Sequence, residues 1–441
     1  MGASRFIGAG IGAISVSLSL SAALVASAYA LEFHELSPDV LKGMKVHTAS
    51  RLAPTFAPSV VGATPAAATV IRNAAAQGSG VPGIDSVVNF TGAYRTAGFD
   101  PNNNPQDQWY YAMVGNSPDR GGVTTIDAPI IPVIVELLDA NGDVLVVNGK
   151  RMVADPRKYV GLVEDSPVFA HYRYTSSESP TQFTDAVFRA AFWSQIEDDW
   201  HTVLRPLIKH PRVMQLPYGS YYYGLNTDGS LQYVLASDPV FGAALFPPVY
   251  PVDASTPIGA AELYGDITTK TIGTFLFDNV YLYENNDPTQ CCVLGYHSFD
   301  AEPGTAANGN LPRFYVMDYA SWITPGLFGG GFEDVTALSH EMSEIFNDPF
   351  VGFDNVHNIT PWWLSPGGLC SDLLEVGDVV EGNATPTYPI TLNGYTYHPQ
   401  TEALLPWFEF KSHPRSLGGA YSYPDATQVT ALSPVEQANC P

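Results

Sequence analysis

The chain has 441 residues and a formal net charge of −24 at pH 7. A charge this negative disfavours nucleic acids and anionic membrane surfaces as partners, because both bind to basic protein surfaces. The length exceeds what one small hydrophobic core needs, so we expect two or three subdomains.

Residues 1–30 have the pattern of a secretory signal peptide. Arg5 supplies a positive charge, an apolar run follows from about Phe6, and Ala28-Tyr29-Ala30 offers the small residues of a cleavage site. The apolar run is long enough that an uncleaved membrane anchor is the alternative. We therefore expect a secreted or periplasmic protein with no membrane partner after signal cleavage. The pattern leaves its oligomeric state open.

Residues 31–105 show little regular hydrophobic periodicity. The part from 63 to 83 is rich in Ala, Gly and small polar residues, which is typical of a linker or a propeptide-like segment. An ordered but irregular extension packed on the main body is the alternative. Beyond a break at 100–105, we expect a sheet-containing upper subdomain over 106–349 and an irregular lower subdomain over 350–441.

Strand patterns dominate the middle of the chain. Aromatic and β-branched runs predict strands at 109–114, 130–138, 144–148, 221–225, 231–235, 273–283 and 313–318. Asn141-Gly142 and Asp228-Gly229 favour the positive φ that tight hairpins need. A helix is expected between the two hairpins, with Ser179 as its cap and Pro180 in its first turn. Its apolar stripe extends to Ile196.

A second helix is predicted within residues 332–349, and it is the most informative stretch of the sequence. Apolar residues recur at helical spacing, at Val335, Leu338, Met342, Ile345 and Phe346. Pro349 ends the pattern because proline cannot continue the hydrogen-bond ladder.

His340 and Glu344 lie on the other side of this helix, one turn apart. An imidazole and a carboxylate at this spacing can both bind one metal ion. The alternative is a solvated polar face, since many surface helices carry such a pair. Glu341 projects about 100° away from His340 and could act as a general base on water.

The sequence His340-Glu341-x-x-Glu344 resembles the active-site helix of zincin metallopeptidases, with glutamate replacing the second histidine. Asp348-Pro349 and Glu375-Val-Gly-Asp378 strengthen a resemblance to secreted metallopeptidases of an uncharacterised family, over roughly residues 291–380. The resemblance implies an α+β, zincin-like fold with a mixed sheet. It also implies a zinc cofactor, although the glutamate ligand leaves the identity of the metal open.

The third metal ligand is expected after the helix. The metzincin spacing would place it at Phe350, which cannot bind a metal, so that subclass is excluded. By resemblance to zincins with a later glutamate ligand, Glu375 is the first candidate, because its apolar neighbours would bury a carboxylate that then needs a partner. The other candidates are Asp378, Asp372 and His357.

The resemblance implies a hydrolase that cleaves a peptide or protein substrate. Glu341 would take a proton from the attacking water and pass it to the leaving amine. Tyr395, Tyr397 and His398 are candidates for stabilising the oxyanion. In zincins an edge strand pairs with the substrate backbone, and 273–283 or 313–318 would take that place. For His297 we favour an ordinary buried or surface histidine over a residue lining the cleft.

Four cysteines in an exported chain predict disulfides. Adjacent cysteines rarely bond each other, because the resulting eight-membered ring is strained. We therefore expect Cys291 and Cys292 to pair with Cys370 and Cys440, in an order that stays open. A zinc site made of two thiolates is the alternative.

A different class of function is also open. The chain is 12% Phe, Trp and Tyr, and exposed aromatics could serve a non-catalytic surface-binding or structural protein on a degenerate zincin-like scaffold. Core packing explains most of these aromatics more simply. Replacing Glu341 separates the two hypotheses, since a binding protein needs no base there.

Overall fold

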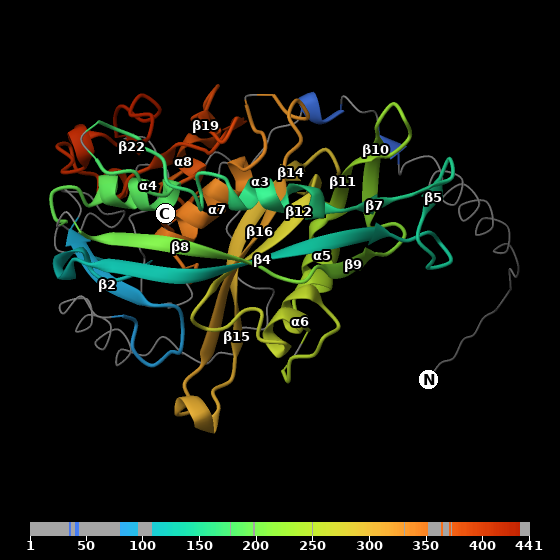
Figure 1. Ribbon diagram of the computed structural model, residues 1–441, viewed down its shortest axis with the longest axis horizontal. Coiled ribbons are helices and arrows are strands. Elements are labelled where there is room, and N and C mark those ends of the chain that lie inside the picture. Colours follow the sequence, from blue (N-terminus) through green and yellow to red (C-terminus); the bar gives the residue numbers. More distant parts are fainter. Residues whose placement is uncertain are drawn as a thin grey trace, which may run out of the picture.

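The computed structural model describes residues 35–36, 40–43, 80–95, 108–176, 178–196, 199–248, 250–329, 331–351, 363–364, 370–371 and 373–432 (Figure 1). The predicted signal peptide and the ligand candidates His357 and Asp372 lie outside these residues. The fold is α+β with a mixed main sheet, as the sequence predicted. Within the described residues, no helix combines the length and the apolar character needed to cross a membrane.

The main sheet has seven strands and is built along the long strand β4. In spatial order it contains β15 (Gly295–Glu302), β16 (Arg313–Trp322), β12 (Ile272–Asp278), β4 (Val123–Leu137) and β7 (Val153–Ala154), with β8 (His201–Ile208) and β9 (Arg212–Leu216) also pairing with β4. β15 and β7 run antiparallel to their neighbours and the other pairs are parallel. The expected edge strand was therefore misplaced: β12 and β16 are internal, and β15 forms the edge.

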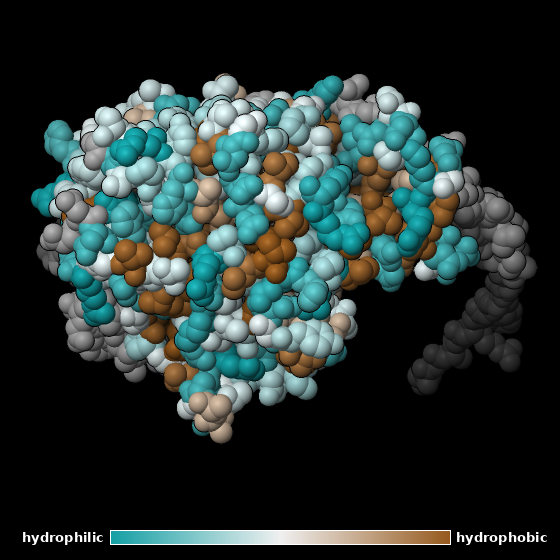
Figure 2. Space-filling view, in the orientation of Figure 1, coloured by the Kyte–Doolittle hydropathy of each residue, from teal (hydrophilic) through white to brown (hydrophobic). Residues whose placement is uncertain are grey.

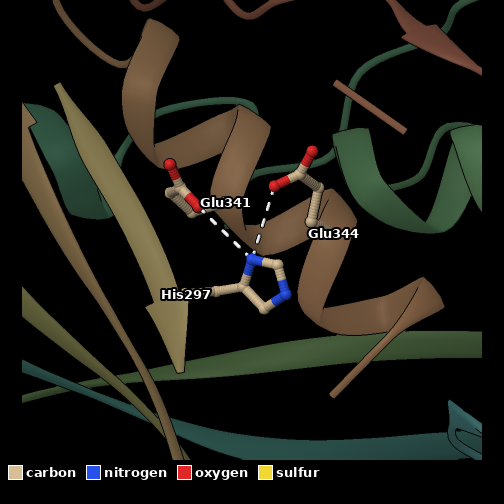
Figure 3. Close-up of side chains that lie close together, drawn as sticks. All are labelled: His297, Glu341 and Glu344. Carbon is tan, nitrogen blue, oxygen red and sulfur yellow. Dashed lines mark ion pairs between the residues drawn. The ribbon is translucent and has the colours of Figure 1, made fainter. Parts of the chain in front are cut away.

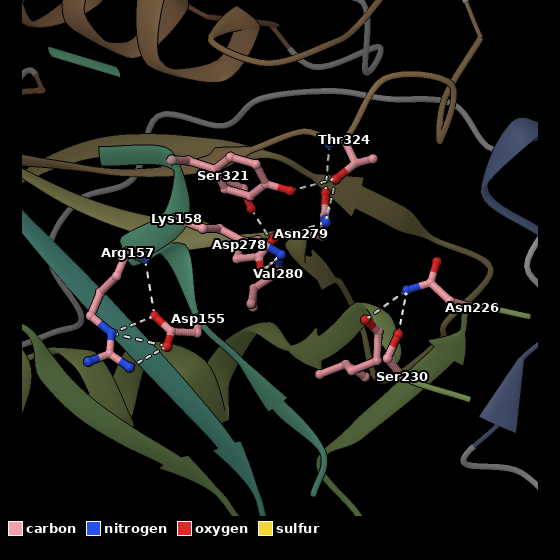
Figure 4. A network of polar contacts seen from close by, with 12 residues as sticks. Asp155, Arg157, Lys158, Asn226, Ser230, Asp278, Asn279, Val280, Ser321 and Thr324 are labelled. Carbon is pink, nitrogen blue, oxygen red and sulfur yellow. Dashed lines mark hydrogen bonds and ion pairs between the residues drawn. The ribbon is translucent and has the colours of Figure 1, made fainter. Parts of the chain in front are cut away.

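A second sheet has five strands in the order β1 (Glu35–Leu36), β10 (Tyr221–Leu225), β11 (Leu231–Ser237), β13 (Val280–Tyr283) and β14 (Cys291–Val293). The predicted strand 273–283 is divided between the two sheets, because Asn279 adopts a φ of 52° between β12 and β13. Its side chain accepts a 2.8 Å hydrogen bond from the Thr324 amide. The Val280 amide donates to Ser321 Oγ at 2.9 Å, and these bonds fix the crossing (Figure 4).

Short two-stranded ribbons complete the strands. They are β2 (Asn89–Arg95) with β3 (Gln108–Val114), β5 (Val146–Val147) with β6 (Lys150–Arg151), β17 (Trp363–Leu364) with β18 (Cys370–Ser371), β19 (Ile390–Leu392) with β20 (Tyr395–Tyr397), and β21 (Glu402–Ala403) with β22 (Ser422–Tyr423). β2 pairs with β3 across the boundary expected near residue 105. A strand of the predicted N-terminal extension therefore pairs with a strand of the predicted upper subdomain.

Seven α-helices lie in the described residues: α3 (Val160–Glu164), α4 (Phe183–Ala191), α5 (Asp238–Leu245), α6 (Pro257–Leu263), α7 (Thr336–Asn347), α8 (Asp378–Glu381) and α9 (Leu405–Phe408). Short 3-10 turns are η1 (Val40–Gly43), η2 (Pro118–Arg120), η3 (Pro156–Tyr159), η4 (Ala306–Asn308) and η5 (Leu417–Gly419). α4 begins after Gln182, later than predicted, because the segment before it forms a bridge between Tyr172 and Thr181.

The largest hydrophobic core surrounds α7. This helix packs against β15, β16, α4 and β3, and the same core includes Leu374, Val376 and Tyr397 from the C-terminal segment. In the described residues after α7, the helices and strands are short and no separate core is formed. Most of the surface facing the viewer is hydrophilic, and hydrophobic side chains lie along the band where β4 and β8 cross the molecule (Figure 2).

The cysteine prediction was wrong. Cys291 and Cys292 lie at disulfide distance from each other. Their peptide bond is cis and their Cα atoms are 3.0 Å apart, the separation that a cis peptide imposes. The expectation rested on the strain of the eight-membered ring that adjacent cysteines form. Cys440 and the side chain of Cys370 lie outside the described part of the chain.

Candidate metal centre

Helix α7 is buried on all sides. The apolar residues predicted to face the core do so, and Leu338, Met342, Ile345 and Phe346 are at most 2% exposed. On the other side, His340, Glu341 and Glu344 are each 0% exposed. The alternative of a solvated polar face is therefore excluded, and the three ionisable side chains need partners inside the protein.

The first of two ligand groups joins the helix to the C-terminal segment. His340 Nε2 lies 3.0 Å from Glu344 Oε1, and it lies 3.6 Å from Asp378 Oδ1 at the start of α8. One ligand atom from each of His340, Glu344 and Asp378 lies within 4.8 Å of the others. The predicted pair on one helix face is thus present, and Asp378 from a later segment joins it.

The second group joins the same helix to the edge strand β15. His297 points from β15 toward α7 (Figure 3). Its Nδ1 lies 3.3 Å from Glu344 Oε2 and 3.5 Å from Glu341 Oε2. His297 is 0% exposed, and neither ring nitrogen has a hydrogen-bond partner among the described residues. The expectation of an ordinary satisfied histidine does not match this environment.

Glu375, the first candidate for the third ligand, is also buried, at 1% exposure. Burial and the nearby charge of Glu344 raise its pKa well above the ordinary range, whereas His297 opposes this shift. Its two carboxylate oxygens lack hydrogen-bond partners within the described structure. Glu375 is therefore a buried carboxylate influenced by Glu344 and His297, but it belongs to neither of the two ligand groups.

Glu402 on β21 is a further buried carboxylate, with 0% exposure and no hydrogen-bond partner for either oxygen among the described residues. Burial raises its pKa, and Glu344 and Glu341 add to the shift while His340 opposes it. The local sequence around Glu402 gave no sign that its side chain would be near the metal ligands. The ligands that shift its pKa most lie on α7, and His340, for example, is 62 residues earlier in the chain.

The charges on the central helix are strongly coupled. Burial raises the pKa of Glu341 to about 7, although His297 and His340 act in the opposite direction. Burial would raise the pKa of Glu344 too, but the two histidines outweigh it and lower that pKa. The pKa of His340 is raised well above its usual value because the carboxylates, Glu344 foremost, outweigh the effect of burial. The pKa of each of these four side chains, His297, His340, Glu341 and Glu344, therefore depends on the charge of its neighbours in this set.

Two glycines make room for the site. A Cβ atom at Gly377 would lie 2.4 Å from ring atoms of His340, and the Gly377 amide donates a 3.1 Å hydrogen bond to Glu344 Oε1. A Cβ atom at Gly295 would lie 2.8 Å from Glu341 Oε1. Gln400 holds the first glycine in place by donating to its carbonyl at 2.8 Å.

These residues fit a divalent transition metal. Imidazole nitrogens combined with carboxylate oxygens suit zinc and similar first-row ions, whereas Ca²⁺ and Mg²⁺ prefer oxygen ligands alone. Atoms without hydrogen-bond partners at 0% exposure are costly in a folded protein unless an ion or water satisfies them. An ion coordinated by His297, Glu341 and Glu344 would remove part of that cost, because the atoms without partners belong to these residues.

The proposed oxyanion residues have other contacts. His398 Nδ1 lies 2.8 Å from Asp334 Oδ2, just before α7, and the His398 amide donates to Asp334 Oδ1 at 2.8 Å. Tyr397 is 1% exposed, and burial raises its pKa to about 12. The structure thus engages His398 at the N-terminal end of the helix rather than with His340 and Glu344.

No protein-family model, no curated protein and no solved structure matches this chain.

Proposed function

We propose that this protein is a metal-dependent hydrolase, with zinc as the first candidate ion and a peptide or protein as substrate. The observation that carries the proposal is the group of His340, Glu344 and Asp378, in which His340 and Glu344 are fully buried. The imidazole nitrogen lies 3.0 Å and 3.6 Å from the two carboxylates. A zincin-like arrangement of α7 below the sheet and export from the cell are parts of the same proposal.

A divalent ion in this group would polarise a carbonyl and make water more acidic. Glu341 is adjacent to His340 in sequence and faces β15, where Gly295 leaves space beside its Oε1. It would accept the proton of the attacking water and return it to the leaving amine as the C–N bond breaks. His297 Nδ1 lies 3.5 Å from Glu341 Oε2, on the β15 side of this carboxylate.

The choice of peptide bonds rests on the likeness of His340-Glu341-x-x-Glu344 to the zincin helix. The net charge of −24 supports it by disfavouring a nucleic acid substrate. Glu375 stays in the proposal as a further ligand, since its carboxylate is buried and neither oxygen has a hydrogen-bond partner among the described residues.

The test is hydrolysis of casein and of a mixed peptide library by the zinc-loaded wild type and by Glu341→Gln. This change keeps the shape of the side chain and removes its basicity, so we expect activity to fall by a factor of about 10² or more. Glu164→Gln, which changes an exposed glutamate on α3, is the matched control and should retain full activity. Equal activity in the wild type and Glu341→Gln would refute the catalytic proposal.

A structural metal site is the second candidate function, and one observation favours it. His340, Glu341 and Glu344 are all 0% exposed, and closed sites without an open position are typical of structural metals. In that case the wild type would bind the metal, lose stability on chelation and hydrolyse none of the substrates.

A further inference from the structure

Glu344 is the ligand that the two close groups share. Its Oε1 lies 3.0 Å from His340 Nε2, and its Oε2 lies 3.3 Å from His297 Nδ1. The two oxygens of one carboxylate therefore face two histidines from different elements, α7 itself and strand β15. Carboxylates that bridge two metal ions present their oxygens in this manner, and such ions stand about 3.5–4 Å apart.

The separations within each group suit an ion between the ligands. Ligands placed tetrahedrally at about 2.0–2.2 Å from zinc stand roughly 3.4 Å from one another. The second group shows 3.3 Å and 3.5 Å from His297 Nδ1, and the first shows 3.0 Å and 3.6 Å from His340 Nε2. Charge-assisted hydrogen bonds are shorter, at about 2.7–2.9 Å. Direct pairing of His297 with the carboxylates therefore fits less well than coordination of a shared ion.

We propose that this cluster holds two divalent metal ions bridged by Glu344. His340, Glu344 Oε1 and Asp378 bind one ion, and His297, Glu341 Oε2 and Glu344 Oε2 bind the other. The inference rests on the proposed function, because it adds an ion to the same site. Glu341 binds the ion through Oε2. Its Oε1, which lies beside Gly295, accepts the proton of the attacking water.

The experiment is metal content by mass spectrometry after saturation with zinc and removal of excess, beside variants of each group. We expect two equivalents in the wild type, one in His297→Ala, one in Asp378→Asn and none in Glu344→Gln. His171→Ala removes an exposed histidine far from the cluster in sequence and should keep two equivalents. Circular dichroism checks that each variant is folded, and His297→Gln replaces His297→Ala if the alanine variant unfolds.

The manganese-loaded protein supplies a second readout. Two bridged Mn²⁺ ions should give a spin-coupled electron paramagnetic resonance spectrum, which His297→Ala and His297→Gln should replace with that of isolated ions. One equivalent of zinc in the wild type at saturation, or unchanged content in folded His297 variants, would overturn the inference. Two ions without hydrolysis would overturn only the proposed function, and one ion with hydrolysis would overturn only the inference.

Discussion

Gly377 is the residue near the metal centre with the least space for a side chain. It packs on the His340 ring so closely that no side chain fits, and its amide donates to Glu344. Metal ligands depend on such neighbours for their orientation, and losing them commonly costs 10- to 100-fold in affinity. The requirement is steric and therefore acts without contact between Gly377 and the ion.

We predict that Gly377→Ala weakens zinc binding by about 10-fold or more, because the added Cβ displaces the His340 ring. Overpacking should also cost about 1–3 kcal/mol of unfolding free energy. Zinc titration and urea denaturation measure the two effects. Gly161→Ala is the control, since a Cβ on that α3 glycine meets nothing within 4 Å. Unchanged affinity in Gly377→Ala would contradict the packing argument.

Glu262 on α6 is a second residue whose burial has a measurable consequence. It is 9% exposed and lies beside Asp300 and Glu302. Burial, with the charge of Asp300 as the next cause, raises its pKa to about 10. The folded protein therefore keeps a proton that the unfolded chain loses near its ordinary pKa of 4.5. The contribution of Glu262 to the free energy of unfolding is therefore fully present below about pH 4.5. It is lost progressively as the pH rises from about 4.5 toward 10.

Glu262→Gln should remove this decline. We predict that the variant gains unfolding free energy relative to the wild type between pH 5 and pH 8, by up to about 1.4 kcal/mol per pH unit. Urea denaturation at several pH values measures the difference. The exposed Glu164→Gln control should show no such trend, and a parallel pH profile for Glu262→Gln would refute the prediction.

At the scale of elements, helix α4 depends on one side chain at its start. Gln182 is 4% exposed and donates from Nε2 to the carbonyls of Phe169 and Leu204, each at 2.7 Å. Its Oε1 accepts from the Leu204 amide at 2.6 Å. The side chain thus ties the helix to β8 and to the preceding turn.

We predict that Gln182→Ala costs about 2–4 kcal/mol of unfolding free energy, because it removes three buried hydrogen bonds at once. Urea denaturation provides the measurement. Gln215→Ala is the control, since that exposed side chain bonds only Glu136 among its described contacts, and we expect a change within about 0.5 kcal/mol. A small loss for Gln182→Ala would show that water replaces its bonds.

At the scale of the whole molecule, the candidate metal centre connects distant parts of the chain. β15 contributes His297, α7 contributes His340, Glu341 and Glu344, and the C-terminal segment contributes Asp378 with Gly377 behind it. A bound ion would stabilise the folded state by mass action, by about 2.7 kcal/mol at a free metal concentration 100 times Kd.

We predict that a chelator lowers the melting temperature of the metal-loaded protein and speeds amide exchange in residues 373–403, because the ion holds that segment to α7. Calorimetry and hydrogen–deuterium exchange measure these effects. Glu344→Gln should resemble the chelated wild type and show no further response to chelator. An identical melting curve with and without chelator would mean that no ion supports the fold.

Local rules made the helix and the hairpins predictable from sequence. The α7 pattern, the spacing of His340 and Glu344, and the turns at Gly142 and Gly229 depend on residues close together in the chain. The α+β class with a mixed sheet was expected from the resemblance of His340-Glu341-x-x-Glu344 to the zincin helix. The predicted strand 273–283 failed because its division at Asn279 depends on hydrogen bonds to Ser321 and Thr324, more than forty residues away.

The composition of the metal centre was decided by tertiary structure. The sequence alone determined that α7 offers an imidazole and a carboxylate one turn apart. It could not determine that His297 and Asp378 meet them, because those contacts join segments 38 or more residues apart. Nor could it show that the polar side of α7 is buried, since burial depends on what packs against a helix. Hydrophobic periodicity identifies which residues share one face of a helix, but the elements that pack against that face depend on the tertiary structure.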